Sequence, residues 1–520
     1  MIINPILRGF CPDPSIIRAG EDYYIATSTF EWWPGVKLFH SRDLKHWEQI
    51  ASPLRRKSQL DMTGDPCSGG IWAPCLSYDG KRFYLLYTDV KTKKGRFYNT
   101  HNYLVYADDI YGEWSEPVYL NSVGFDPSLF HDMDGKKYLV NMINGFKGIW
   151  IQEFDADALC LKGEPKKIFA GSGIGCTEGP HIYHIGQWYY LLTAEGGTGY
   201  EHCVTIARAP AVEGPYEVDP KNPMLTSDRK DMSMLQKCGH ADIVEIHSGE
   251  YYMVHLCARA RSGEEACVLG RETAIQRIHL DEQDWFRLSC GGNIAQNETE
   301  ELSDICAWQA ASAAEREDFD SSVIDLDTGI SFVSPRISMQ EYANVTDRKG
   351  FLRIRGRESL NSLHQVSFLG KRQQAFDVIA ETAFEFSPQY PEQMAGMAYM
   401  YDAMNFYLLG KTVNEAGKSV LVLLMSDMGV IMDACEEILL PSDKMVWLRA
   451  QTTDEGKLVH FYWSMDGVEW YVIGASCDTR ILTDEHCRGF TGAHFGMYVH
   501  DMTEQKAYAD FDYFLLKQAE

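Results

Sequence analysis

Residues 124–142 read GFDPSLFHDMDGKKYLVNM, and this stretch contains the pattern that decides the fold. A short apolar strand follows Asp126, a turn carries Gly135, and a second strand alternates aromatic and aliphatic residues. Such a hairpin places glycine where a tight turn needs a positive φ. Its opening also repeats the earlier stretch GFCPDPSI at 9–16. The segment is therefore interpreted as one copy of a recurring unit.

The same unit occurs five times between residues 1 and 290. Its opening positions are Asp13, Ala73, Asp126, Glu178 and His240, and its turns carry Gly20, Gly80, Gly135, Gly186 and Gly249. Several hairpins are followed by a second pair of strands, as in LFHSRDLKHWEQI at 38–50. Four-stranded units spaced by about 50–60 residues, without a sustained helical period, are typical of a β-propeller. We therefore predict a five-bladed β-propeller over residues 1–290.

Three acidic residues stand at the openings of these units. In a propeller the innermost strand of every blade lines the central axis, so Asp13, Asp126 and Glu178 should meet at one mouth, with His240 at a fourth position. A lone Asp-Pro is ordinary turn chemistry, whereas three carboxylates at matching positions favour a site. Two carboxylates flanking a bond are the minimum for glycoside hydrolysis, and a third acid raises the pKa of its neighbour.

Metal binding is the competing use of such a cluster. Hard oxygen ligands suit Ca²⁺, but the chain lacks the dense D-x-D-x-D spacing of a calcium loop. We expect no required cofactor and no metal site, and a single structural Ca²⁺ on the axis near His240 stays an open alternative.

Length and composition limit the other possibilities. At 520 residues the chain should divide into two or more domains, and 45% hydrophobic with 23% charged residues is typical of a folded, soluble protein. The 48 basic and 74 acidic residues give a net charge of −26, which argues against nucleic-acid and membrane partners. Aromatic residues at 12% suit a site that stacks on sugar rings. We see no secretory signal and no C-x-x-C pair among the 14 cysteines, so we expect a cytoplasmic protein.

The pattern changes after residue 290. Residues 291–315 form a polar connector, and strands with period-2 alternation return over residues 316–520, as in AFDVIAETAFEF at 375–386 and ADFDYFLL at 509–516. This alternation predicts an antiparallel β-sandwich. A carbohydrate-binding module is the alternative, although no exposed aromatic platform is evident in the sequence.

Several motifs together resemble one known family. They are NPILRGFCPDPSII at 4–17, GIWAPCLSY at 70–78, GFDPSLFHD at 124–132, CTEGPHIY at 176–183, CGHADIVE at 238–245 and LGRETAIQ at 269–276. In this order and spacing they resemble glycoside hydrolase family 43, most of all its β-xylosidase branch, and the resemblance continues through ESLNSLHQVSFLGKRQ at 358–373. It implies that the second domain is a jelly-roll-like sandwich that leans a loop over the propeller mouth and admits only chain ends.

The resemblance also implies roles for the three acids. Asp13 would be the general base that polarises the attacking water, and Glu178 the general acid that protonates the departing oxygen. Asp126 would tune the pKa of the acid and orient it. Because the family inverts configuration by single displacement, the carboxyl groups of Asp13 and Glu178 should lie roughly 6.5–9.5 Å apart.

Five further residues match sugar contacts of the family, and each has a plainer alternative. Phe30 and Trp72 resemble the aromatic walls around the terminal sugar, although blade packing would also place them. Arg271 resembles the arginine that binds sugar hydroxyls, and a structural ion pair is its alternative. His240 would steady Glu178, an ion or a water, or be a satisfied core histidine. Thr198 would contact substrate or only serve its loop.

Two details of the pocket rim stay open. The segment TGAHFGMYVHD at 491–501 is expected to supply the loop over the mouth, through either His494 or Phe495. The segment RSGEEACV at 261–268 is shorter than the corresponding loop of similar β-xylosidases, which leaves specificity on the leaving-group side undecided.

The expected activity is that of an exo-acting, inverting β-xylosidase, a xylan 1,4-β-xylosidase. It would release xylose from the non-reducing ends of xylo-oligosaccharides, with α-L-arabinofuranosidase activity as an addition or an alternative. A non-catalytic sugar-binding propeller is less favoured because all three acids are present. From the resemblance we also expect a homo-oligomer, either a dimer or a tetramer.

Overall fold

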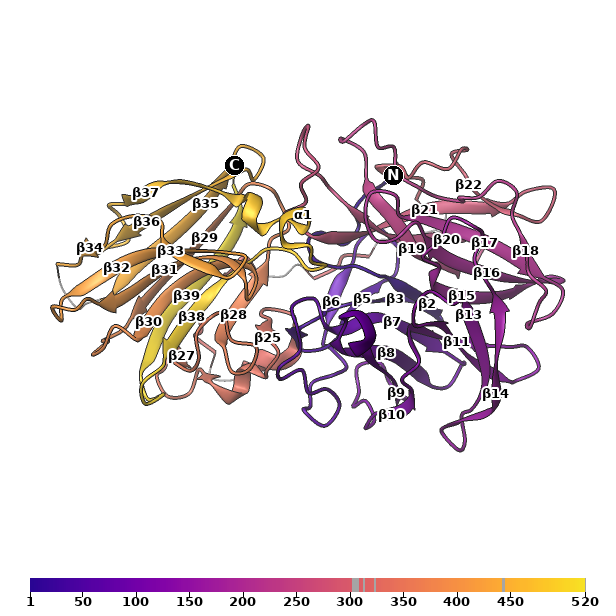
Figure 1. Cartoon of the computed structure of the whole chain (residues 1–520), viewed down its shortest axis with the longest axis horizontal. Coiled ribbons are helices and arrows are strands. Elements are labelled where there is room, and N and C mark those ends of the chain that lie inside the picture. Colours follow the sequence, from indigo (N-terminus) through magenta and orange to yellow (C-terminus); the bar gives the residue numbers. More distant parts are fainter. Residues whose placement is uncertain (302–307, 312–313, 322–323, 442–444, 520) are drawn as a thin grey trace.

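The chain folds as two β-structures joined side by side (Figure 1). The computed structural model describes residues 1–301, 308–311, 314–321, 324–441 and 445–519, so parts of the predicted connector over 291–315 lie outside the described residues. Residues up to 288 form five four-stranded antiparallel sheets, and two larger antiparallel sheets follow. The all-β prediction of a five-bladed propeller followed by a β-sandwich is confirmed.

Each blade is one continuous segment of chain whose strands pair in sequence order. Blade one contains β2 (Ser15–Ala19), β3 (Asp22–Thr27), β5 (Lys37–Ser41) and β6 (Glu48–Ile50), and blade two contains β7 (Gly70–Tyr78), β8 (Phe83–Thr92), β9 (Asn99–Ala107) and β10 (Val118–Asn121). Blade three contains β11 (Gly124–His131), β12 (Lys137–Ile143), β13 (Ile149–Asp155) and β14 (Cys160–Phe169), and blade four contains β15 (Glu178–Ile185), β16 (Trp188–Glu195), β17 (Cys203–Ala209) and β18 (Glu217–Val218). Blade five contains β19 (Gln236–Glu245), β20 (Tyr251–Ala258), β21 (Arg271–Leu280) and β22 (Phe286–Leu288). The first strands of neighbouring blades contact one another around a closed ring, which puts five strand starts at one axis.

The local sequence accounts for the backbone conformation at both ends of each blade's first hairpin, the turn and the end at the propeller axis. The five predicted turn glycines all have positive φ, as tight hairpin turns require. At the axis, the chain also takes positive φ at one residue in every blade: Asp13 (52°), Ala73 (32°), Asp126 (53°), Gly179 (55°) and His240 (40°). The strand pairing shifts register beside this residue in blades two to five. Blades two to five therefore begin with a bulge, which re-aims side chains at the mouth of the propeller, whereas in blade one Asp13 has the same positive φ and the pairing of β2 with β3 keeps its register.

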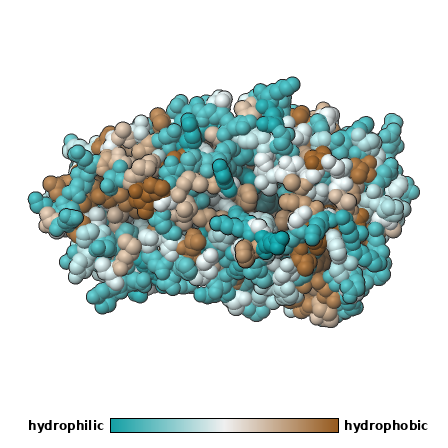
Figure 2. Space-filling view, viewed as in Figure 1, coloured by the Kyte–Doolittle hydropathy of each residue, from teal (hydrophilic) through white to brown (hydrophobic). Residues whose placement is uncertain are grey.

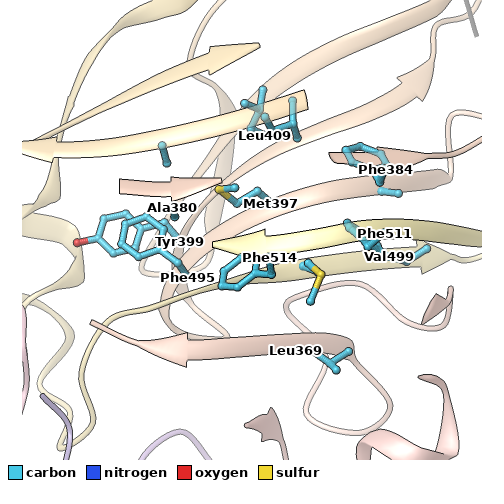
Figure 3. Close-up of a cluster of buried hydrophobic side chains, with 14 of the residues drawn as sticks. Leu369, Ala380, Phe384, Met397, Tyr399, Leu409, Phe495, Val499, Phe511 and Phe514 are labelled. Atoms are coloured by element: carbon cyan, nitrogen blue, oxygen red, sulfur yellow. The ribbon is translucent and has the colours of Figure 1, made fainter. Parts of the chain in front are cut away.

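The second domain is a sandwich of two antiparallel sheets. One contains β24 (Arg316–Glu317), β26 (Ala343–Asn344), β27 (Leu352–Arg355), β29 (Val378–Glu385), β35 (Val446–Thr453), β36 (Leu458–Ser464), β37 (Tyr471–Asp478) and β39 (Tyr508–Gln518); the other contains β28 (Ser367–Arg372), β30 (Gln393–Asp402), β31 (Asn405–Val413), β32 (Ser419–Asp427), β33 (Val430–Asp433), β34 (Ile438–Leu439) and β38 (His494–Asp501). Figure 3 shows how the facing side chains fill the core, with Met397 and Phe495 from one sheet and Phe384 and Phe511 from the other.

The two domains share a small sheet and an apolar core. In that sheet β4 (Trp32–Trp33) of the propeller pairs with β25 (Ser334–Pro335). Trp32 and Phe30 of the propeller pack with Phe368 and Tyr498 of the sandwich. The chain ends of the propeller are tied in a similar way, because β1 (Ile2–Ile3) pairs with β23 (Glu298–Thr299). Burial on this scale fixes the sandwich against the propeller.

Helices are few and short. The described ones are η1 (Gly95–Phe97), η2 (Leu326–Thr328), η3 (Met339–Glu341), η4 (Thr479–Leu482) and α1 (Asp484–Cys487). In the described part of the chain, no helix has the length and apolar character needed to cross a membrane. Helix α1 belongs to the sandwich domain but lies at its boundary with the propeller (Figure 1).

Candidate active site

A cavity of about 210 Å³ opens at the axis of the propeller. Its lining includes all eight residues singled out in the sequence: Asp13, Phe30, Trp72, Asp126, Glu178, Thr198, His240 and Arg271. The other lining residues are Tyr98, Phe125, Phe146, Gly197 and Phe490. Three acids from three different blades thus share one pocket with a histidine and an arginine.

The residue with positive φ at each blade start explains which side chains reach this pocket. At the position with positive φ, Asp13, Asp126 and His240 line the cavity. At the position just before it, Trp72, Phe125 and Glu178 line the cavity as well. A non-glycine residue in this backbone region costs on the order of 1 kcal/mol or more, and such residues occur in turns and cluster at functional sites.

The structure corrects one detail of the repeat. The residue of blade four that corresponds to Asp13 and Asp126 is Gly179, which has the positive φ, and Glu178 lies one position earlier. A Cβ on Gly179 would lie 3.0 Å from the ring of His240, so this position has no room for a side chain. The blade therefore presents its acid from the preceding position, and the imidazole packs against the backbone that follows it.

Asp13 is held by hydrogen bonding and by a nearby histidine. The hydroxyl of Ser28 donates to Asp13 Oδ2 at 2.6 Å and accepts from the backbone N–H of Ala73 at 2.8 Å. His240 Nδ1 lies 3.9 Å from Asp13 Oδ1. A hydroxyl donor of this kind fixes the orientation of the carboxylate.

Asp126 and Glu178 are coupled through both charge and backbone. The N–H of Gly179 donates to Asp126 Oδ2 at 3.0 Å, so the aspartate is tied to the backbone directly after the glutamate. Burial, together with the negative charge of Asp13, raises the pKa of Glu178 to about 8. Burial also raises the pKa of Asp126, and the neighbouring charges of Glu178 and Asp13 add to this, while His240 opposes it. Like charges that share a buried pocket cannot all ionise, so this cluster retains a proton near neutral pH.

Aromatic rings form most of the remaining wall. The ring centroid of Trp72 lies 5.3 Å from that of Phe125 and 6.3 Å from that of Phe30, with near-perpendicular or tilted planes. Tyr98 lies 6.0 Å from Phe125, and Phe146 lies 6.3 Å from it on the other side. Flat apolar faces of this kind suit the faces of a sugar ring.

The second domain closes the pocket with Phe490, which corrects the predicted candidates. Its ring centroid lies 5.7 Å from Phe30 and 5.9 Å from Trp72. His494 instead stacks on Trp32 at 3.9 Å, and Phe495 stacks on Tyr399 at 3.9 Å inside the sandwich core. The reason is that strand β38 begins at His494, so both predicted residues belong to the packed strand, and the residue that reaches out lies in the loop before it.

Arg271 is the cation of the pocket. Its Nη2 donates to the carbonyl oxygen of Thr198 at 2.9 Å, which accounts for the position of both predicted residues. The guanidinium carbon lies 4.6 Å from the ring centroid of Phe490, a cation–π distance. The arginine thus presents its charge beside the aromatic lid and opposite the acids.

Sequence reasoning missed five lining residues, one of which, Gly197, is the direct neighbour of the predicted Thr198. Phe125 lies inside the motif GFDPS and could have been found from its place directly before Asp126, which corresponds to that of Trp72 before Ala73. Tyr98, Phe146 and Phe490 lie outside the repeated motif, and only the fold brings them to the axis. The segment 261–268 is absent from the pocket lining and packs toward the sandwich, where the N–H of Cys267 donates to Glu485 at 2.8 Å.

A metal ion has few ligands in this pocket. Within the described ranges no group of three or more His, Cys, Asp or Glu side chains is arranged to hold one. An axial Ca²⁺ near His240 stays an open alternative.

The arrangement agrees with comparisons to known proteins. Residues 2–286 match the model of glycosyl hydrolases family 43, and residues 316–517 match that of the β-xylosidase C-terminal concanavalin A-like domain. The chain is 44% identical to "Beta-xylosidase" of Bacillus subtilis (strain 168), over 99% of each chain, and 44% identical to "Xylosidase/arabinosidase 43B" of Humicola insolens, over 99% of this chain and 97% of that one. The crystal structure of a xylan β-1,4-xylosidase from Bacillus halodurans C-125 superposes with a TM-score of 0.95 at 44% identity, covering both chains completely.

Proposed function

The chain belongs to glycosyl hydrolase family 43, and from this premise we propose that it is an exo-acting, inverting β-xylosidase. Its substrates are xylo-oligosaccharides, from whose non-reducing ends it releases xylose. The observation that carries the proposal is the single pocket in which Asp13, Asp126 and Glu178 meet under Phe490 of the second domain. The match to β-xylosidases over the whole length of both domains supports the same activity.

In the proposed reaction, Glu178 is the general acid. A general acid must hold a proton at working pH, and burial with the nearby charge of Asp13 raises its pKa to about 8. It delivers that proton to the glycosidic oxygen as the bond to the anomeric carbon breaks. The leaving xylo-oligosaccharide then departs with a neutral hydroxyl.

Asp13 is the general base on the opposite side of the sugar. Its carboxylate takes a proton from a water as the water oxygen bonds to the anomeric carbon, which inverts the configuration. The hydrogen bond from Ser28 supports this role because it fixes the orientation of the carboxylate. Asp126, tied to the N–H of Gly179, acts as the positioning residue that orients Glu178 and tunes its pKa.

The remaining pocket residues bind the terminal sugar. Phe30 and Trp72 pack on its faces, and the free edge of the Arg271 guanidinium binds its hydroxyls. His240 steadies Asp13 and packs against the backbone next to Glu178. A cavity of about 210 Å³ under the lid of Phe490 favours one terminal pentose unit and therefore exo action.

The test compares hydrolysis of an aryl β-D-xyloside and an aryl α-L-arabinofuranoside by the wild type, Asp13→Ala and Glu178→Ala. We expect the wild type to prefer the xyloside and both variants to lose nearly all activity. Chromatography of products from xylotetraose should show xylose from the first turnover onward. Alanine variants with wild-type rates, or early release of xylobiose, would overturn the proposal.

α-L-Arabinofuranosidase activity is the second candidate. The relative from Humicola insolens carries both activities in its printed name, at the same identity as the Bacillus subtilis β-xylosidase. Both substrates are pentosides that differ in ring size and in the placing of a few hydroxyl groups. The same pair of aryl substrates therefore decides which activity dominates, through the ratio of the two kcat/KM values.

Two further parts of the proposal concern the cellular location and the oligomeric state of the enzyme. We place it in the cytoplasm and expect a dimer or a tetramer. Exposed apolar side chains at the outer end of the sandwich support self-association, and they include Val430 and Ile431 of the edge strand β33. Figure 2 shows brown surface over this end of the molecule. Light scattering after size exclusion measures the assembly, and fractionation of the source cells measures the location.

A further inference from the structure

Arg271 lies in the propeller, but the carboxylate nearest to its Nε comes from the sandwich. Asp484, the first residue of helix α1, has its Oδ2 3.8 Å from Arg271 Nε. That nitrogen is buried and has no hydrogen-bond partner among the described residues. Nη2, which lies on the same edge of the guanidinium as Nε, donates to the carbonyl of Thr198. At 3.8 Å from Nε, Asp484 therefore acts on the arginine through charge, beside the edge that Thr198 holds.

Asp484 is itself fixed from two sides. The hydroxyl of Tyr401 donates to its Oδ1 at 2.7 Å, and Nζ of Lys237 donates to its Oδ2 at 3.0 Å. The N–H of Asp484 donates to the carbonyl of Cys267, at the end of the short segment before Arg271. The carboxylate is buried, so it can hold its charge only through these partners.

Its neighbour Glu485 makes a matched but separate set of contacts. Glu485 Oε1 lies 2.7 Å from Nζ of Lys237 and accepts from the hydroxyl of Tyr200 at 2.9 Å. No ion pair within 4.0 Å joins Glu485 to Arg271 in the part of the chain that the structure describes. Two buried cations, the buried Asp484 and the partly exposed Glu485 thus form one cluster, and among the described residues Asp484 is the acid of the cluster within 4.0 Å of the pocket arginine.

The backbones of the two domains touch beside this cluster. Gly270 has φ +73°, and a Cβ there would lie 2.1 Å from the carbonyl oxygen of Thr491. The N–H of Ala493 donates to the carbonyl of Val268 at 3.0 Å across the same contact. The residues next to this contact are Arg271 on one chain segment and Phe490 on the other. The sandwich therefore approaches the arginine with both a ring and a charge.

We propose that Asp484 is a positioning residue through which the sandwich domain orients Arg271 toward the terminal sugar and balances its charge in the pocket. This rests on the proposed function. The second domain then determines the electrostatics of the site as well as its shape. No contact of Asp484 with substrate is required, because it lies behind the arginine.

The charge balance has a consequence for the general acid. The charged and titratable groups that face Glu178 are Asp13, Asp126, His240, Arg271 and Tyr98. Of these, Arg271 opposes the upward shift of the pKa of Glu178 that burial and Asp13 cause. Beyond the pocket lining, the charged and titratable groups that interact electrostatically with Arg271 are Lys237, Asp484, Lys93, Tyr401 and His202. Neutralising Asp484 leaves the surroundings of Arg271 more positive, so the pKa of Glu178 should fall.

The experiment compares Asp484→Asn with Glu485→Gln, two adjacent acids of one helix that share Lys237. For Asp484→Asn we expect KM for an aryl β-xyloside to rise about tenfold, the factor that loss of one charged contact produces. We also expect the alkaline limb of its pH–rate profile to move down by roughly half a unit. Glu485→Gln should lower the melting temperature to a similar extent but keep KM within about twofold and leave the alkaline limb in place.

Each outcome decides the matter. Wild-type KM and pH profile in Asp484→Asn would overturn the inference, and so would equal changes in both variants, because these would indicate general loosening of the interface. If Asp484→Asn fails to fold, Tyr401→Phe takes its place. It keeps the charge but frees the carboxylate, so KM should rise about threefold with an unchanged pH profile; an unchanged KM overturns the inference. If the wild type is inactive on both pentosides, the proposed function is overturned. If the wild type is active and the variants give one of the contradicting outcomes, the inference alone is overturned.

Discussion

Two groups of buried charges meet at Arg271, and they are built in opposite ways. In the pocket, Asp13, Asp126 and Glu178 bring like charges together, and the pKa values of Asp126 and Glu178 rise. At the domain interface, Lys237 and Arg271 balance Asp484 and Glu485, and the pKa of Lys237 rises because Asp484 and Glu485 outweigh the opposing effect of burial. Burial raises the pKa of Asp484 as well, but the charges of Lys237 and Arg271 oppose that rise, whereas in the pocket the charge of Asp13 adds to the rise for Glu178.

Burial alone therefore does not decide whether a charged group serves proton transfer or fixes a structure. Like charges that are buried together hold a proton that is ready for transfer, and this weakens the fold. Opposite charges that are buried together fix one geometry, and removing either partner leaves an uncompensated charge. The pocket is thus the reactive group, and the interface cluster is the rigid one that supports it.

The largest expected effect separates the two acids of the pocket by their leaving-group dependence. On xylobiose, Asp13→Ala and Glu178→Ala should each lose about 10²–10⁴-fold in kcat/KM. On a β-xyloside with a strongly acidic phenol, Glu178→Ala should recover most of that loss because the phenolate departs without a proton. Asp13→Ala should stay equally impaired on both substrates. Equal recovery in the two variants would contradict the assigned roles.

Breaking the interface cluster should cost stability. Among the described residues, Lys237→Met leaves Asp484 with Arg271 and Glu485 without an ion pair within 4.0 Å, and we expect a loss of about 3–5 kcal/mol in the free energy of unfolding. Lys166→Met is the control, because the ion pair of Lys166 with Glu213 is solvent-exposed and should contribute less than about 1 kcal/mol. Urea unfolding measures both. A similar small loss in the two variants would show that the buried cluster contributes little.

The lid prediction compares two phenylalanines of the sandwich. Phe490→Ala removes a ring that closes the pocket, so KM for xylobiose should rise about tenfold, while the melting temperature changes little. Phe495→Ala creates a cavity in the sandwich core beside Tyr399 and should lose about 3–5 kcal/mol of stability with KM unchanged. Steady-state kinetics and thermal unfolding of both variants test the pair, and the reversed pattern would restore Phe495 as the lid.

Neutralising an acid of the pocket should stabilise the protein. The folded-state pKa of Glu178 is raised from 4.5 to about 8, so between these values the folded state holds a proton that the unfolded state has released. Wild-type stability therefore falls as pH rises across this window. Glu178→Gln avoids that loss and should exceed the wild type by on the order of 1–3 kcal/mol at pH 8 and by almost nothing at pH 4. A gap that narrows with increasing pH would refute this sign.

The smallest effect is a pH limb of the wild-type reaction. Because the general acid must be protonated, kcat/KM should fall about tenfold per unit as pH rises above about 8, the pKa of Glu178. Measurement of kcat/KM for xylobiose from pH 5 to pH 10 checks this, with enzyme re-assayed at pH 7 to exclude unfolding. An alkaline limb near pH 5 would mean that burial does not raise the pKa of the acid.

The propeller and its acids could be predicted because the signal repeats. Each blade repeats the same hairpin with a glycine turn. Because the first strand of every blade lines the propeller axis, the acids at the strand starts are expected to converge there without knowledge of individual contacts. The one-residue offset of Glu178 could not be seen, because it depends on the bulge and on the space that His240 takes beside Gly179. Local sequence identified the acid, and only the backbone fixed its register.

The contributions of the sandwich were harder to predict. Phe490 and Phe495 are both aromatic residues next to one strand start, and nothing in their spacing tells which faces the pocket. The pairing of Lys237 with Asp484 joins residues 247 positions apart through the docking of two domains. Neither has a repeat or a local pattern behind it. A long-range contact that occurs only once in a fold produces no periodic pattern in a single sequence.

The strand pair of β4 with β25 has a consequence for the evolution and engineering of this molecule. Trp32 and Trp33 sit in the catalytic half, yet their backbone partners Ser334 and Pro335 belong to the other half. A chimera that joins this propeller to the C-terminal half of a distant homologue would have to preserve the β4–β25 strand pair, the packing of its tryptophans and the loop carrying Phe490 at the same time. The two halves should therefore diverge in step, and a recombination library is best cut elsewhere than at the apparent linker.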